Sequence, residues 1–162
     1  MAPVIALAIG SATMAGTPSP LPRQTSLGTL ETARDSVEAI SRRALARDTS
    51  VHWNRSPTQF TYWYSQASVR GWAIHMTVTD STGCPTDTLE RSLEAAGWTP
   101  NYDYSADGPD GHVQGYVQSG YLCVLDARWD GEDDSDPTYV PAPGCQVILT
   151  CVPFRKDDAA TR

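Results

Sequence analysis

The chain has 162 residues, of which 40% are hydrophobic and 19% charged, a balance typical of one globular domain rather than of a disordered chain. Its formal net charge of −7 argues against nucleic-acid binding, which needs a basic surface to neutralise phosphates. An anionic membrane surface is disfavoured as a partner for the same reason.

Residues 1–22 predict a signal-like apolar segment followed by a proline-rich linker. An apolar run from Pro3 to Ile9 precedes small residues, and cleavage after Ala15 would fit the pattern of an exported protein. The run is too short for a stable membrane span, so we predict a secreted or periplasmic protein. No Lys or Arg precedes the run, which leaves an unstructured N-terminus as the alternative.

Two amphipathic helices are expected. The first covers residues 27–46 with Ser26 as its N-cap, because apolar residues recur there at steps of three and four: Leu27, Leu30, Ala33, Val37, Ile40 and Ala44. The second opens at Asp87, which can cap the helix while Glu90 reaches back in a capping box, and it ends at Gly97.

In the remaining segments, apolar and polar residues alternate as they do in β-strands. Residues 59–79 predict a β-hairpin that turns near Ser68 and places Tyr64 opposite Trp72. Residues 100–153 predict four antiparallel strands joined by turns and by a long acidic loop, 130–144. The resulting fold is α+β: helix, hairpin, helix and four-stranded meander, with two helices packed on an antiparallel sheet of about six strands. We expect a single domain at 23–154 and a disordered tail at 155–162.

The four cysteines, Cys84, Cys123, Cys145 and Cys151, are even in number and follow a signal-like segment, which predicts two disulfides. A strand between Cys145 and Cys151 would hold their Cα atoms roughly 20 Å apart, beyond the disulfide reach of about 7 Å. Pairing strands 121–129 and 145–152 about Pro137 instead places Cys123 opposite Cys151. This register favours Cys123–Cys151 with Cys84–Cys145. The alternative is Cys84–Cys151 with Cys123–Cys145, because a direct cross-strand bond strains the ladder.

The acidic loop is the most distinctive polar feature. Clustered carboxylates can supply the six to eight oxygen ligands that calcium prefers, and five residues here are candidate ligands: Asp126, Asp130, Glu132, Asp134 and Asp136. The spacing does not match an EF-hand, because Arg128 falls where a ligand should be. The alternative is a solvated loop that keeps the sheet edge soluble.

No other motif selects a reaction. The three histidines lie in different predicted elements. His112 could pair with Asp110 in the preceding turn, but the favoured interpretation is a surface residue of the hairpin. Zinc-ribbon, nucleophile-elbow and phosphate-loop spacings do not occur in the sequence. Trp53, Trp63 and Tyr139 are candidate contact aromatics, because exposed Trp and Tyr are favoured interface anchors.

These patterns favour an exported, non-catalytic binding or structural module of the cell envelope or extracellular space, with a protein or surface polymer as its partner. A calcium-stabilised domain that binds the ion in the acidic loop is one alternative. A hydrolase with an unidentified pair of acids is the other, because nothing selects a pair among the 19 acidic residues.

Overall fold

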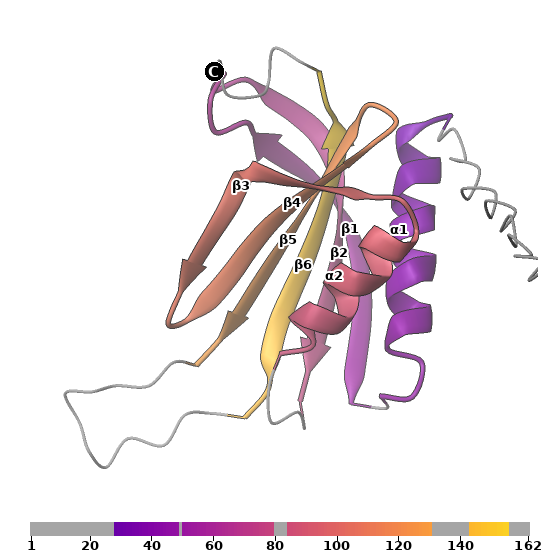
Figure 1. The fold of residues 1–162 in the computed structure, drawn as a ribbon, viewed down its shortest axis with the longest axis vertical. Coiled ribbons are helices and arrows are strands. Elements are labelled where there is room, and N and C mark those ends of the chain that lie inside the picture. Colours follow the sequence, from indigo (N-terminus) through magenta and orange to yellow (C-terminus); the bar gives the residue numbers. More distant parts are fainter. Residues whose placement is uncertain (1–27, 49, 80–83, 131–142, 156–162) are drawn as a thin grey trace, which may run out of the picture.

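The computed structural model describes residues 28–48, 50–79, 84–130 and 143–155. They form one six-stranded antiparallel sheet with strand order β1-β2-β6-β5-β4-β3, and two helices (Figure 1). The elements are α1 Leu30–Ala44, β1 Val51–Thr61, β2 Ser68–Val78, α2 Thr86–Ala95, β3 Thr99–Gly108, β4 Gly111–Gln118, β5 Tyr121–Trp129 and β6 Cys145–Pro153. The predicted α+β fold is confirmed.

Both helices pack on one face of the sheet, where the main core lies. Period-2 alternation along β5 and β6 aims Cys123, Leu125, Val147 and Leu149 at this face, and all four are fully buried. The helices cover them with side chains spaced three or four residues apart: Ala33 and Val37 from α1, and Leu89 and Leu93 from α2.

The helix caps differ from those that the sequence suggested. Thr29 caps α1 by accepting a hydrogen bond from the Thr32 amide at 3.2 Å, whereas the predicted cap, Ser26, lies outside the described residues. Helix α2 begins at Thr86 without a side-chain cap, so the predicted capping box is wrong. Glu90 bonds His112 instead, which it reaches because α2 lies over β4.

The predicted register of the first hairpin is also wrong. The turn covers residues 62–67, and Pro57 rather than Tyr64 lies opposite Trp72. The first strand therefore begins at Val51, eight residues earlier than expected. The sequence did not predict the first part of β1, because polar residues and a proline interrupt the alternation of apolar residues there. These residues are tolerated because β1 is an edge strand, where a proline need not break a ladder bond.

The register of β5 and β6 is confirmed. Cys123 lies opposite Cys151 and Trp129 opposite Cys145, as pairing about Pro137 requires. The disulfides are Cys123–Cys151, with Cα atoms 4.1 Å apart, and Cys84–Cys145, with Cα atoms 5.6 Å apart. The favoured connectivity is therefore correct, and the alternative connectivity is not formed.

A β-bulge between Asn101 and Ser105 changes the direction of side chains on β3. The buried side chain of Gln114 spans the irregularity, donating to the carbonyls of Asn101 at 3.3 Å and Gly115 at 2.9 Å. Tyr104 joins a second core on the sheet face away from the helices. This smaller core contains Tyr62, Tyr104, Leu122, Val124 and Val152, with Phe60, Val69, Val113, Val117 and Phe154 packed around it.

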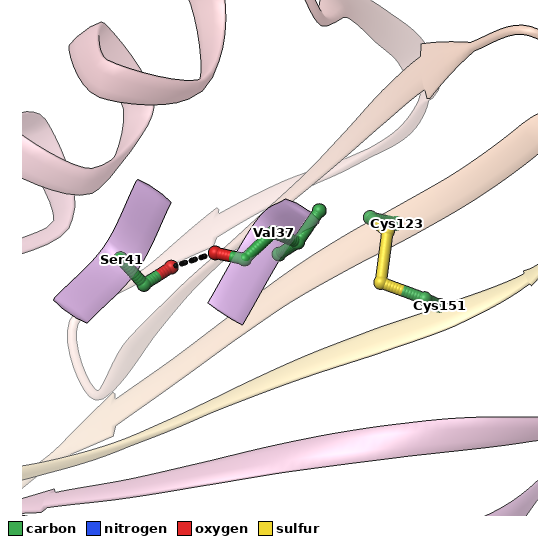
Figure 2. Close-up of a disulfide and its surroundings, with 4 residues drawn as sticks. All are labelled: Val37, Ser41, Cys123 and Cys151. Carbon is green, nitrogen blue, oxygen red and sulfur yellow. Dashed lines mark hydrogen bonds between the residues drawn. A yellow bond between two sulfur atoms is a disulfide. The ribbon is translucent and has the colours of Figure 1, made fainter. Parts of the chain in front are cut away.

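Ser41 offers a test of how closely α1 approaches the sheet (Figure 2). Its fully buried hydroxyl donates to the Val37 carbonyl at 2.9 Å, a bond within the helix that supports no other element. Ser41→Ala is expected to change the free energy of unfolding by less than about 0.5 kcal/mol, whereas Ser41→Leu should lower it by about 1–3 kcal/mol through overpacking. Urea unfolding of both variants measures the difference, and equal midpoints would contradict close packing here.

Candidate functional site

The turn between β1 and β2, residues 62–67, holds its shape through hydrogen bonds of its own; we call it the aromatic turn. The Tyr62 amide donates to the Ala67 carbonyl at 3.0 Å, and the Gln66 amide donates to the Tyr62 carbonyl at 3.0 Å. Gln66 adopts φ +57°, and its side-chain amide donates to the Trp63 carbonyl at 2.5 Å. These bonds fix the backbone that carries Trp63 and Tyr64.

Trp63 and Tyr64 remain exposed although they pack on the second core. Trp63 is 41% exposed with its ring centroid 5.1 Å from that of Tyr104, and Tyr64 is 50% exposed in an edge contact with Tyr104 at 6.1 Å. The Tyr64 hydroxyl donates to the Asp103 carbonyl at 3.2 Å. Both rings are therefore seated on the bulged part of β3 and still present surface to solvent.

The turn that carries these rings has polar side chains and no charged ones. Residues 61–69 contain no acidic or basic side chain, although the chain as a whole carries a net charge of −7. Thr61, Ser65, Gln66 and Ser68 are all exposed and can exchange hydrogen bonds with a ligand. The turn thus combines two aromatic rings with a neutral, hydrogen-bonding rim.

The predicted contact aromatics are only partly brought together. Trp63 lies in the aromatic turn, whereas Trp53 is half-buried on β1 beneath the guanidinium of Arg42, 4.5 Å from its ring centroid. Tyr139 lies outside the described residues. Sequence reasoning missed Tyr64, because the misplaced hairpin register assigned it to a core-facing strand. Tyr102 is 73% exposed on β3 and lies outside the aromatic turn.

Two of the five predicted calcium ligands lie in the described part of the chain. Asp126 is on β5 and forms an ion pair with Arg128 at 3.0 Å, while Asp130 borders an open pocket of about 360 Å³ beside Trp129. The other three, Glu132, Asp134 and Asp136, lie outside the described residues. Among the residues that the structure describes, no three His, Cys, Asp or Glu side chains are arranged to hold a metal ion. Calcium binding by the loop stays a prediction.

A cluster of titratable side chains lies on the helix-covered side of β4. His112 contacts Asp107 through Nδ1 and Glu90 through Nε2, so it is neither the surface hairpin residue that the sequence favoured nor, as the alternative had it, the partner of Asp110. Burial raises the pKa of Tyr116, and the charges of Glu90 and Glu94 raise it further. Sequence alone could not reveal the cluster, because Glu90 comes from a different element.

Both carboxylates of this cluster are engaged by the same imidazole. Burial lowers the pKa of His112, but hydrogen bonds to Asp107 and Glu90, together with their charges, raise it above the ordinary 6.5 in total. Because the acids bind opposite ring nitrogens, they cannot share one metal ion with His112. The arrangement joins elements of the fold and favours the charged form of the ring.

No family model matches this sequence, and neither a curated protein nor a solved structure shows significant similarity to it. In the described segments, neither helix has the length and apolar character needed to cross a bilayer.

Proposed function

We propose that the chain is an exported binding module that recognises a surface polymer or a protein through the aromatic turn. One observation carries the proposal: Trp63 and Tyr64 are about half exposed, yet ring contacts and hydrogen bonds fix their position. Large aromatic side chains that are ordered before binding lose little conformational entropy on contact, which makes them effective anchors.

Export is supported by the disulfides. Both bonds join distant parts of the chain, with sequence separations of 61 and 28 residues. Disulfides persist in oxidising compartments and are rare in the cytosol. The signal-like segment, residues 1–22, lies outside the described residues, and its role in export is part of the same proposal.

A neutral polymer is favoured over a protein as the partner. A stable protein interface buries about 800 Å² on each side, more than two aromatic rings on a short turn provide. Stacking on one or two sugar rings needs only those rings and a rim of hydrogen-bonding groups. Residues 61–69 also lack the charges that would select an ionic ligand. A hydroxyl-rich polysaccharide fits these features.

Co-sedimentation of the oxidised protein with insoluble chitin, cellulose and peptidoglycan tests the proposal. We expect retention by at least one polymer, and Trp63→Ala should raise the dissociation constant roughly tenfold or more, because truncating an aromatic anchor costs more than about 1 kcal/mol. Tyr102→Ala is the matched control, since Tyr102 is more exposed than Trp63 but lies outside the turn. Its binding should equal that of the wild type.

Two results would count against the proposal. Equal retention of Trp63→Ala and the wild-type protein would show that the aromatic turn is not the contact surface. Failure of all three polymers to retain the wild type would reject the polymer as ligand and leave a protein partner with a wider footprint. Circular dichroism of each variant checks that the fold is intact.

A further inference from the structure

His112 connects helix α2 to the β3–β4 hairpin through both nitrogens of its ring. Nε2 lies 2.5 Å from Glu90 Oε1 on α2, and Nδ1 contacts Asp107 near the end of β3. The His112 and Glu90 side chains are only 20% and 23% exposed, whereas Asp107 is 78% exposed. The ring is thus partly shielded between a helix and a hairpin.

The geometry favours a charged ring. An ionised carboxylate only accepts hydrogen bonds, so both contacts are hydrogen bonds only when both ring nitrogens carry protons. A neutral imidazole has one N–H group and presents a lone pair at the other nitrogen. Deprotonation therefore removes one of the two bonds and leaves a lone pair facing a carboxylate.

The surroundings of His112 and its neighbour Tyr116 are mostly acidic. Tyr116 is buried on β4, and burial together with the charges of Glu90 and Glu94 raises the pKa of its phenol. Glu94 of α2 and Tyr102 of β3 are charged or titratable groups that act on Tyr116, whereas Asp110 of the β3–β4 turn and Asp126 and Arg128 of β5 border the same pocket as Asp107 and His112. Arg128 is paired with Asp126, so the imidazolium is the cation that separates Glu90 from Asp107.

We propose that His112 is a pH-sensitive latch, which holds α2 against the β3–β4 hairpin when its ring is protonated and loosens that contact when the ring is neutral. Once the proton leaves, two carboxylates flank the His112 ring, which can donate a hydrogen bond to only one of them. The pKa of His112 is raised in the folded protein, so the stabilisation is fully present below about pH 6.5, the value for an unfolded chain. It is lost as the pH rises through the higher folded-state value.

Thermal unfolding of the full oxidised chain between about pH 5.5 and about pH 8.5 tests the latch. Relative to His112→Gln at each pH, the wild-type midpoint should fall by roughly 3–12 °C across this range, which corresponds to the loss of one charge-assisted bond. His52→Gln is the matched control, because His52 is an exposed residue of β1, and this variant should keep the wild-type pH dependence. The same pH dependence in His112→Gln and wild type would overturn the proposal.

A second variant keeps the test decisive if His112→Gln does not fold. Glu90→Gln retains the ring and the size of its α2 partner but removes one negative charge. In an NMR titration, the His112 ring should then titrate at a lower pH than in the wild type. The difference in α2 amide exchange between acidic and alkaline pH should also shrink. An unchanged His112 titration in Glu90→Gln would show that α2 does not sense the charge of the ring, which would also overturn the proposal.

Discussion

Replacing Cys123 and Cys151 together by alanine is expected to destabilise the protein more than replacing Cys84 and Cys145. Loop length alone predicts the opposite order, because the first bond spans 28 residues and the second 61. Chain entropy gives the longer loop an advantage of only about 0.7 kcal/mol, within a typical contribution of 2–4 kcal/mol for each bond.

The deeper burial of Cys123 and Cys151 is expected to reverse the order that loop length predicts for the two stability losses. Cys123 and Cys151 are completely buried beneath α1, whereas Cys84 is half-buried and Cys145 is 6% exposed. Removing two sulfurs from a close-packed core leaves space that costs roughly 1 kcal/mol for each group of methyl size. The loss should therefore be about 4–5 kcal/mol for Cys123→Ala/Cys151→Ala and about 3–4 kcal/mol for Cys84→Ala/Cys145→Ala.

Urea unfolding of both double variants, with the slope checked for two-state behaviour, measures these losses. Cys123→Ala/Cys151→Val refills part of the space without restoring the bond, and it should recover some of the lost stability. If the Cys84 and Cys145 variant proved the less stable one, loop closure rather than packing would dominate the role of these bonds.

Trp98→Phe is expected to stay within about 1 kcal/mol of the wild-type stability, while Trp98→Ala loses about 3–5 kcal/mol. The indole follows Gly97, which ends α2 with φ +91°, and it turns back into the main core, where it is 2% exposed. Within the described residues, no acceptor lies within hydrogen-bond distance of its Nε1. A buried donor without a partner costs about 1–3 kcal/mol, and phenylalanine removes that donor at the expense of some ring volume.

Trp129→Phe is the matched control for this comparison. The Trp129 indole donates to the Pro109 carbonyl at 2.8 Å, so its replacement removes a formed hydrogen bond worth about 0.5–1.5 kcal/mol. Urea unfolding of Trp98→Phe, Trp98→Ala and Trp129→Phe measures the change in the free energy of unfolding for each variant. A loss in Trp98→Phe close to that in Trp98→Ala would mean that the Trp98 N–H is hydrogen-bonded in solution.

Sequence patterns predicted the register of strands and the buried side of helices correctly where one face of the element is buried and its apolar residues recur regularly. Alternation in residues 121–129 and 145–152 fixed the β5–β6 register, and that register placed Cys123 opposite Cys151. The three- and four-residue spacing of Ala33, Val37, Leu89 and Leu93 predicted which sides of the helices are buried. In these cases a wrong alignment would expose a whole apolar face, so few alternatives exist.

The patterns failed where tertiary contacts override local preference. Strand β1 carries Asn54, Arg55 and Pro57 because its outer edge lies open, and this hid both the strand and the exposure of Tyr64. Glu90 contacts His112 of β4 and does not form the predicted capping box of α2. This contact can form only when α2 is packed against the sheet. The signal-like segment, Tyr139 and the outer part of the acidic loop stay predictions, because they lie outside the described residues.

The position of β6 has a consequence for how the chain matures. This last strand of the described chain lies in the middle of the sheet, between β2 and β5 (Figure 1), and each disulfide uses one of its cysteines. During synthesis, Cys84 and Cys123 therefore emerge before either native partner, and the one disulfide that they could form within the chain at that stage is the non-native one. Correct pairing then requires that these thiols stay reduced until β6 has emerged, or that a non-native bond between them is later exchanged for the native ones.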